Sequence, residues 1–368
     1  MNFSLNDMKE CIDLAHSKNV KVYVTANIYA YNDDLGDIRK YFEELNVVKP
    51  DAVLISDIGV ISIAKEILKG IDIHLSTQAN TTNYETVKFF SNLGIKRVVL
   101  ARELSLGEIK KIKDEVGDDV EIETFVHGSM CISYSGRCLL SAYMTGKSAN
   151  DGLCTHPCRW KYMLLEEEER KGEYMPVIET ERGTYIFNSK DLNMIEHVDK
   201  LIEAGIDSLK IEGRMKSPLY VAIVTRTYRK AIDDYYKGID IYRDNIKTYK
   251  DEIGKCTYRE YTTGFYFGKP DENTQIYDNS TYIKGSTFFG IIEKVDDEFA
   301  YLEQKNKFSV GDTLVVMKND FSNLTVKVLS IYDAETNKEL DSCPHSKEKL
   351  KVKFDKKVEV MDVLRSID

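Results

Sequence analysis

Four cysteines gather in one short stretch of the chain. Cys131, Cys138, Cys154 and Cys158 fall within 28 residues, whereas the other three of the seven cysteines are isolated. Thiolates are soft ligands that select zinc, copper(I) or iron–sulfur clusters. Four of them could hold a structural Zn²⁺ or a four-iron cluster. Their spacing matches neither the common zinc knuckle nor a ferredoxin motif, so zinc, an iron–sulfur cluster and buried free thiols all stay open on spacing alone.

A second set of polar side chains follows short β-branched runs. The runs are 20–26, 51–57, 72–77, 97–102, 120–127 and 208–212, and each is rich in Val, Ile, Leu or Thr, as strands buried on both faces are. The side chains at their carboxyl ends are Asn27, Asp57, Gln78, Glu103, His127 and Glu212. Parallel strands bring these ends to one edge of a sheet, where ligands bind in α/β barrels and in open α/β sheets.

Amphipathic stretches separate these runs and predict helices. They cover 5–18, 34–46, 59–69, 83–93, 106–116, 191–204 and 217–236. The first five strands start 21 to 31 residues apart, which is the spacing of βα units and predicts a parallel sheet. No G-x-G-x-x-G motif follows a strand, which disfavours a dinucleotide site. We therefore expect an α/β fold of the TIM-type (β/α) barrel class, with about six of eight βα units present.

The pattern of the chain predicts three regions. Residues 1–240 form the (β/α) barrel, and an insertion at 129–188 carries the cysteines and strand-like segments at 161–168 and 174–188. Residues 241–284 are a Tyr-rich connector. Short alternating runs with turn residues between them occupy 285–368 and predict a small all-β barrel of five or six strands.

Charge and hydropathy narrow the classes of function. The net charge of −10 argues against a generally basic surface that coats nucleic acid. One local exception is 209–230, where six basic side chains accompany only Glu212. No apolar run approaches the roughly 18–20 residues that span a bilayer, and the first residues lack the pattern of a secretory signal. These features predict a cytoplasmic protein without a membrane partner.

Several long motifs resemble one family. ETFVHGSMCISYSGRCLLSAYMTGKSANDGLCTHPCRWKY at 123–162 and LKIEGRMKSPLYVAIVTRTYRKAID at 209–233 resemble the U-32 peptidase, or collagenase-like, family. Within it, the chain is most similar to the prephenate-dependent tRNA uridine 5-hydroxylation proteins. Further matches are VYVTAN (22–27), LSTQANTTN (75–83), LARELSLGEI (100–109) and TTGFYFG (262–268). Family members begin with two further βα units, so the resemblance implies an N-terminal truncation, a mis-assigned start, or a partner that supplies the rest.

The resemblance implies a function. It implies a barrel with a four-iron, 4Fe-4S cluster held by Cys131, Cys138, Cys154 and Cys158, with zinc as the alternative metal. It also implies hydroxylation of the wobble uridine of tRNA to 5-hydroxyuridine, with prephenate or a similar small carboxylate as oxygen donor. Two alternatives are a collagenase-like peptidase and a non-catalytic assembly subunit that needs a protein partner or paralogous subunit.

This activity suggests roles for the residues at the strand ends. Arg102 and Arg214 are candidates for the donor carboxylates, or else they pair with Glu103 and Glu212. His127 is a candidate general acid or base, or else a hydrogen-bonded histidine at the rim. Glu123 and Glu212 are candidate bases, or else partners of Lys210. The amides of Gln78, Asn80 and Asn27 are candidates to bind the edge of the uracil ring.

The RNA itself needs cations and aromatic rings. The basic stretch offers Lys216, Arg226, Arg229 and Lys230 for phosphates. Tyr258, Arg259, Tyr261, Phe265 and Tyr266 could stack on unpaired bases, or could simply pack between domains.

Overall fold

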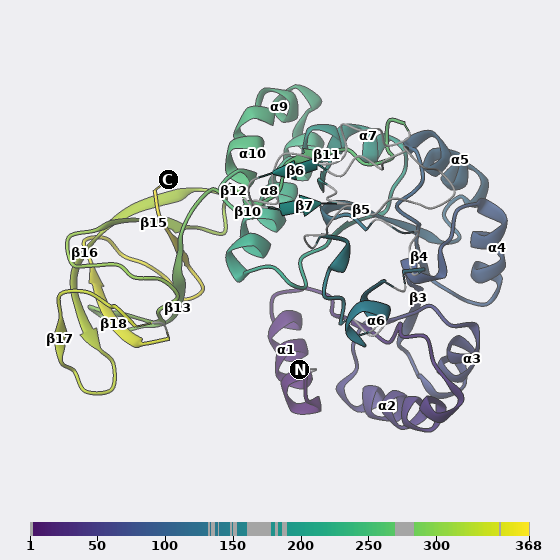
Figure 1. The fold of residues 1–368 in the computed structure, drawn as a ribbon, viewed down its shortest axis with the longest axis horizontal. Coiled ribbons are helices and arrows are strands. Elements are labelled where there is room, and N and C mark those ends of the chain that lie inside the picture. Colours follow the sequence, from purple (N-terminus) through teal and green to yellow (C-terminus); the bar gives the residue numbers. More distant parts are fainter. Residues whose placement is uncertain are drawn as a thin grey trace. The chain divides into compact units, whose positions relative to one another are not determined.

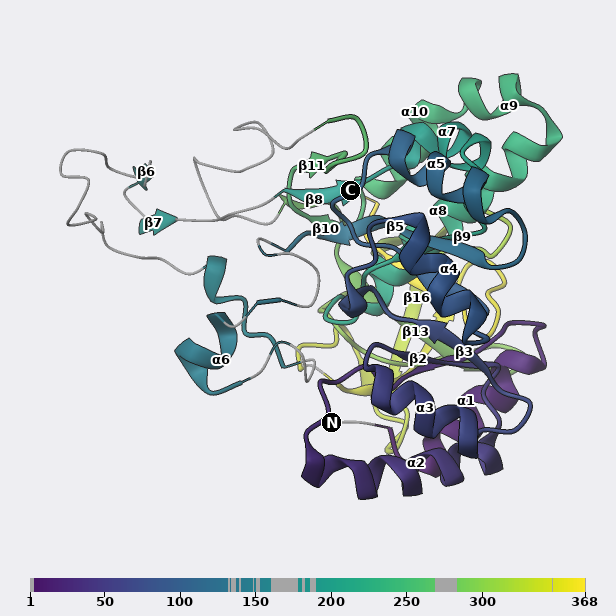
Figure 2. The same cartoon turned by 90° about the vertical axis from the view of Figure 1, so that its right-hand side faces the viewer.

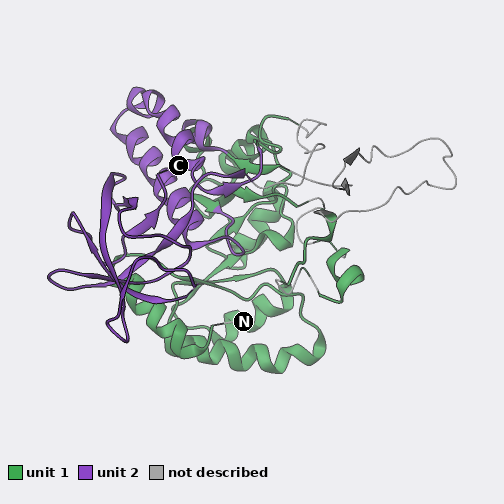
Figure 3. Cartoon of the chain, turned by 60° about the vertical axis from the view of Figure 1, so that its left-hand side comes forward, with its two compact units in different colours: residues 1–193, 200–210, 261–280 green, residues 194–199, 211–260, 281–368 purple. Residues whose placement is uncertain are grey.

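The computed structural model describes most of the chain in two compact units (Figure 3). The described residues are 3–131, 133, 137–138, 140–147, 149, 153–159, 178–180, 183–185, 190–268, 283–345 and 347–367. Unit 1 comprises Met1–Asn193, Lys200–Lys210 and Tyr261–Ser280, and unit 2 comprises Met194–Asp199, Ile211–Glu260 and Thr281–Asp368. Within the described ranges, no helix combines the length and the apolar character needed to cross a membrane.

Unit 1 is built on a parallel sheet, which confirms the predicted fold class (Figures 1 and 2). Its strands are β1 (Tyr23–Thr25), β2 (Ala52–Ile55), β3 (Asp72–Leu75), β4 (Arg97–Val99) and β5 (Glu121–Ser129). Each pairs with the next in parallel. β9 (Ser208–Ile211) pairs with β5 as the sixth predicted strand. The arrangement is TIM-like, so the carboxyl ends of the parallel strands share one edge.

Helices connect these strands close to the predicted bounds. They are α1 (Leu5–His16), α2 (Leu35–Val48), α3 (Ile58–Ile67), α4 (Tyr84–Asn92) and α5 (Leu106–Val116). Four of the five begin after a Ser, Asp or Asn whose side chain accepts a backbone N–H of the first turn. Each then buries one apolar face, as α5 does with Ile109, Ile112 and Val116.

The insertion contains α6 (Leu140–Thr145), the 3₁₀ turn η3 (Pro157–Arg159) and two antiparallel strands, β6 (Ile178–Thr180) and β7 (Gly183–Tyr185). These two strands confirm the strand-like segment predicted at 174–188. The predicted strand at 161–168 lies outside the described residues.

The helix predicted at 191–204 is wrong in its first half, because the α-helix begins only at Val198. Residues Asp191–Asn193 form strand β8, followed by the 3₁₀ turn η4 (Ile195–His197) and the short helix α7 (Val198–Glu203). β8 pairs antiparallel with the second half of β5 and in parallel with β11 (Tyr261–Thr262). Pairing on both sides satisfies the backbone of β8, and this outweighs the helical spacing of the apolar residues across 191–204.

The helices of unit 2 lead into the predicted connector at 241–284, and the last two cover its first residues, up to Ile253. They are α8 (Pro218–Lys237), α9 (Ile239–Asp244) and α10 (Ile246–Ile253), and the strands β10 (Thr257–Tyr258) and β12 (Ile283–Lys284) pair antiparallel after them. At Gly285 the backbone passes so close to Gly254 that an added Cβ would lie 1.9 Å from the carbonyl oxygen of Gly254. Only glycine fits at this crossing.

The C-terminal part of unit 2 is a small closed β-barrel, as predicted. Its strands are β13 (Phe288–Val295), β14 (Ala300–Glu303), β15 (Thr313–Met317), β16 (Asn323–Asp333), β17 (Glu339–Leu340), β18 (Lys349–Phe354) and β19 (Val363–Arg365). The order β15-β19-β13-β14-β18-β16 closes because β15 also pairs with β16, and β17 adds to β16. Alternate side chains fill the interior, among them Phe308, Val316 and Val352.

Candidate functional site

A hydrogen-bonded 3₁₀ turn, η2 (Thr77–Ala79), follows β3 at the carboxyl edge of the sheet, with Ser76 before it and Asn80 after it. The Asn27 Nδ2 donates to Ser76 Oγ at 3.1 Å, and Ser56 Oγ donates to the Asn27 carbonyl at 3.1 Å. On the other side, the Ala101 N–H donates to the carbonyl of Thr81 at 3.0 Å. The turn is therefore fixed between the ends of β1 and β4, and Asn27 has a positioning contact rather than a free amide.

Two amide side chains on this turn have buried acceptors without donors. Among the described residues, neither Gln78 Oε1 nor Asn80 Oδ1 has a hydrogen-bond partner, although both atoms are buried. Asn80 holds the turn with a left-handed backbone, φ 54°, a conformation that Asn tolerates. A buried acceptor without a donor costs free energy, so both oxygens are suited to an N–H group of a ligand.

Arg102 lies beside this turn, directly after β4. Its Nη1 donates to the carbonyl of Ser129 at 3.1 Å, and its guanidinium carbon lies 4.7 Å from the centre of the Phe125 ring. No ion pair among the described residues includes Arg102, so the expected alternative of a pair with Glu103 is not what the structure contains. Arg102 borders a small cavity together with Thr124, Phe125 and Tyr266. Its remaining donors can bind a carboxylate in the two-point manner typical of arginine.

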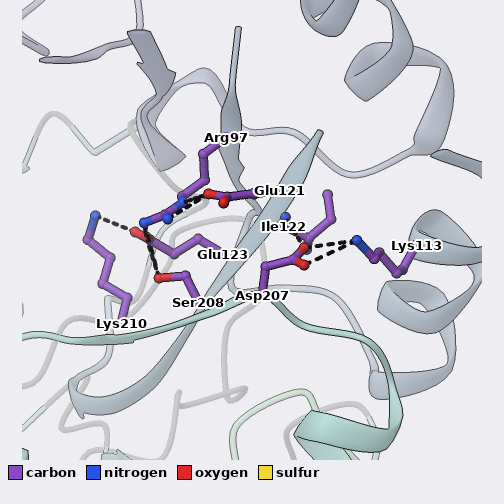
Figure 4. A network of polar contacts seen from close by, with 8 residues as sticks. All are labelled: Arg97, Lys113, Glu121, Ile122, Glu123, Asp207, Ser208 and Lys210. Carbon is purple, nitrogen blue, oxygen red and sulfur yellow. Dashed lines mark hydrogen bonds and ion pairs between the residues drawn. The ribbon is translucent and has the colours of Figure 1, made fainter. Parts of the chain in front are cut away.

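A network of ion pairs joins side chains of β4, β5 and β9 (Figure 4). The carboxylate of Glu123, whose residue is 5% exposed, accepts from Lys210 Nζ at 2.9 Å, Arg97 Nη1 at 3.1 Å and Ser208 Oγ at 2.8 Å. Burial by itself raises the pKa of Glu123, but Lys210, Ser208 and Arg97 outweigh it and hold this pKa below its usual value. Glu123 and Lys210 are therefore brought together as charged partners.

A neighbouring contact fixes β9 against β5. Asp207 Oδ2 accepts the backbone N–H of Ile122 at 2.7 Å and lies 3.0 Å from Lys113 Nζ (Figure 4). The sequence interpretation missed this pair and also missed Arg97. The signal for Arg97 was available, because a charged residue opens a strand that is otherwise buried.

His127 is buried, at 1% exposed, rather than placed on an open rim. It shares one face of β5 with Phe125 and Glu123, because alternate residues of a strand point the same way. Its ring centre lies 5.4 Å from that of Tyr261. A second buried histidine, His74, contacts Tyr23 with 4.8 Å between ring centres. Burial and the nearby charge of Arg97 lower the pKa of His74 to about 4.

Glu212, Arg214 and Lys216 belong to unit 2. The carboxylate of Glu212 accepts the backbone N–H of Arg214 at 3.0 Å, and the Arg214 side chain is exposed. Lys216 Nζ lies 5.0 Å from the centre of the Tyr220 ring.

Three of the four predicted RNA-contacting cations have carboxylate partners inside unit 2. Arg226 pairs with Glu252, Arg229 with Asp233 and Lys230 with Asp234. Arg226 is also nearly buried and donates to the carbonyl of Lys318.

Two of the aromatic and basic candidates for base stacking are packed. Tyr266 is buried, and its hydroxyl donates to the carbonyl of Phe125 at 2.6 Å; Arg259 is buried as well. Both side chains are therefore buried rather than exposed for stacking, and Phe265 lines the small cavity.

The four clustered cysteines lie on the insertion, and none of them is part of a disulfide. Cys131 and Cys154 are exposed, and Cys138 and Cys158 are partly buried. The residue after Cys154 is hydrogen-bonded to α6, because the Thr155 N–H donates to Ser141 Oγ at 3.0 Å. A set of four accessible thiols without disulfides fits a soft metal or an iron–sulfur cluster chemically. In the described ranges, however, no three potential ligands are close enough together to hold a metal ion.

Comparison with known proteins relates both units to one family. Residues 1–276 match Peptidase family U32, and residues 284–365 match Peptidase family U32 C-terminal domain. The tRNA hydroxylation protein P1 of Bacillus subtilis is 36% identical over 366 residues, covering 99% of this chain and 85% of the relative. The tRNA hydroxylation protein P of Escherichia coli is 38% identical, covering 86% and 77%. A collagenase of Porphyromonas gingivalis is 29% identical, covering 91% and 82%.

Proposed function

Because the chain belongs to peptidase family U32, we propose that it is a tRNA hydroxylase that converts the wobble uridine to 5-hydroxyuridine. The observation that carries this proposal is the 36–38% identity, over most of the chain, to two proteins named for tRNA hydroxylation. A tRNA substrate also implies that the enzyme acts in the cytoplasm. Prephenate or a similar small carboxylate is the proposed oxygen donor.

The reaction needs an oxygen donor that is itself reduced. Replacing the C5–H bond of uridine by C5–OH oxidises the base by two electrons, so the donor that yields the hydroxyl group accepts two electrons and a hydrogen. Arg102 is the proposed site for a donor carboxylate, because its guanidinium has no carboxylate partner among the described residues and is oriented by Ser129 and Phe125. Arg214, with its exposed side chain in unit 2, remains the second proposed carboxylate ligand.

The uracil ring presents an N–H between two carbonyl oxygens. The buried oxygens of Gln78 and Asn80 have no donor among the described residues and could accept this N3–H. Cytosine has an acceptor at the same position, so the same oxygens would disfavour it. His127, buried on β5 beside Phe125, is the proposed residue that accepts or returns a proton at the base.

We further propose that Cys131, Cys138, Cys154 and Cys158 hold a 4Fe-4S cluster, with zinc as the alternative. Such a cluster would supply one-electron chemistry to the reaction. The proposal is supported by the absence of these four cysteines from any disulfide and by their exposed or partly buried positions. Metal and sulfide content, measured on anaerobically purified full chain and on Cys138→Ala, tests it: about four irons and four sulfides that are lost in the variant are expected, and zinc or no metal in folded protein would overturn it.

Mass spectrometry of tRNA nucleosides tests the activity itself. A strain without the gene, and without a redundant relative, should lose 5-hydroxyuridine derivatives and regain them with the wild-type chain. Arg102→Gln should restore little, and Arg39→Gln, which alters an exposed ion pair with Glu66, should restore them fully. Unchanged nucleosides in the deletion strain would refute the proposal.

Because one relative is named a collagenase, peptidase activity is the second candidate function. Gelatin digestion by highly purified protein, lost on substitution of His127, would favour it. A third reading, a non-catalytic assembly subunit, predicts co-purification of a stoichiometric partner protein.

A further inference from the structure

Lysines and tyrosines alternate across four neighbouring strands of the small β-barrel. The strand register places Lys294 of β13 opposite Tyr301 of β14, Tyr301 opposite Lys351 of β18, and Lys351 opposite Tyr332 of β16. We call these four residues the Lys–Tyr row. Because neighbouring strands lie about 4.8 Å apart, the row extends over roughly 14 Å of one continuous surface.

The row lies on the outer face of the barrel. Along β18, Leu350, Val352 and Phe354 are buried in the interior, so the alternating Lys349, Lys351 and Lys353 point outward. This face therefore adds two more lysines beside Lys351.

Aromatic rings and ammonium groups contact each other on this face. Lys351 Nζ lies 4.4 Å from the centre of the Phe299 ring, and Phe299 packs edge-on against Tyr332 with 5.8 Å between ring centres. Lys294 Nζ lies 5.2 Å from the centre of the Tyr301 ring. The rings thus hold the lysines on the surface by cation–π contacts.

Most of these lysines form no direct ion pair. In the described part of the chain, Lys294, Lys349 and Lys351 have no carboxylate oxygen within ion-pair distance, while Lys353 lies 3.4 Å from Glu298. Two acids border the row, because the Tyr301 hydroxyl donates to Asp296 at 2.8 Å and the strand register places Glu303 opposite Lys349. The lysines are therefore only partly balanced on this face, although the net charge of the chain is −10.

We propose that the Lys–Tyr row is an RNA-binding surface for unpaired nucleotides of the substrate. Proteins bind single-stranded RNA by pairing lysines with phosphates while aromatic rings stack on bases, often on the face of a β-sheet. The alternation of the row matches that requirement, since consecutive phosphates and bases also alternate along the strand. The proposal rests on the proposed function, in which tRNA is the substrate, and adds a contact surface in unit 2 to the reacting site in unit 1.

Binding of an unmodified tRNA transcript with a wobble uridine, measured over a range of salt concentrations, tests the proposal. The full chain is compared with Lys294→Gln/Lys349→Gln/Lys351→Gln. Loss of three phosphate contacts should weaken binding at least about tenfold and reduce the slope of log K against log [salt] by about 2. Tyr332→Leu should weaken binding about fivefold or more, with less change in the slope.

A matched control separates this surface from net charge. Lys307→Gln/Lys338→Gln/Lys357→Gln removes the same charge from exposed positions of the same barrel, and binding should change less than threefold. If wild-type protein binds the transcript and the row variant binds equally well, the inference is wrong and the proposed function stands. If wild-type protein neither binds nor hydroxylates tRNA, the proposed function fails and the inference with it. Equal weakening in the control and the row variant would also overturn the inference.

Discussion

Replacing Glu123 by glutamine should destabilise unit 1 strongly while preserving the shape of the side chain. The buried carboxylate has two cationic partners, Lys210 at 2.9 Å and Arg97 at 3.1 Å. Removing one partner of a buried ion pair costs about 3–5 kcal/mol, because a charge is left without compensation. Lys210 is 28% exposed and Arg97 keeps its contact with Glu121, so the loss should be near the lower limit, about 3 kcal/mol.

The assay is urea unfolding, with the midpoint and slope fitted separately. Glu121→Gln is the matched control, because Glu121 pairs with the same arginine from an exposed position, and it should cost less than about 1 kcal/mol. Lys210→Met combined with Glu123→Gln should recover at least about 1 kcal/mol relative to the sum of the single variants. Equal stability of the two glutamine variants, or strict additivity in the double variant, would refute the reasoning.

The same carboxylate predicts a pH dependence. Because the folded state lowers the pKa of Glu123, its contribution is fully present above the unfolded-state pKa and is lost as the pH falls through the lower folded-state pKa. The difference in stability between wild type and Glu123→Gln should therefore shrink in acid. A difference that grows on acidification would contradict the direction of the pKa shift.

Three further predictions use other parts of the structure. Gly285→Ala would place a Cβ 1.9 Å from the Gly254 carbonyl oxygen and should cost about 3 kcal/mol in thermal unfolding, whereas Gly36→Ala, which meets no atom within 4 Å, should cost nothing. Because the pKa of His74 is lowered to about 4, the unfolded state binds more protons than the folded state between pH 6.5 and pH 4. About 3 kcal/mol of stability should therefore be lost as the pH falls through that range, and His74→Phe should not show this loss. Urea unfolding midpoints measure it, and a flat wild-type profile would contradict the reasoning. In steady-state kinetics, Arg102→Gln should raise KM for the carboxylate donor at least about tenfold, with partial recovery in Arg102→Lys; an unchanged KM would remove Arg102 from the donor site.

The periodic parts of the fold were predictable from the sequence because local chemistry and tertiary structure agree there. Val and Ile runs in unit 1 form parallel strands, and capping residues such as Ser105 start helices at the expected positions. Agreement failed at Asp191–Asn193, the start of a segment whose apolar residues follow a helical spacing but whose first three residues form a strand. The reason is the pairing of this segment with β5 and β11, which lie far away in the sequence.

The candidate site was predictable by residue type and less so by partner. The polar ends of β3 and β4 do supply Gln78, Asn80 and Arg102 at one edge. Sequence alone offered both Glu123 and Glu212 as partners of Lys210 and could not choose between them, because Glu123 is 87 residues away from Lys210 in the chain. Nor did it show that Arg226 forms an ion pair with Glu252, since a basic stretch does not reveal which acidic residues pack against it in the fold.

The contact of Tyr266 with Phe125 has a consequence for the order of folding during synthesis. These residues are 141 positions apart, and β11, just before Tyr266, is also needed beside β8. When the parallel strands have left the ribosome, Tyr266, whose ring packs beside β5, has therefore not yet been released. Unit 1 should stay incomplete until the helices of unit 2 have emerged, and chains that end near residue 260 should expose the surface around Phe125 to chaperones and proteases.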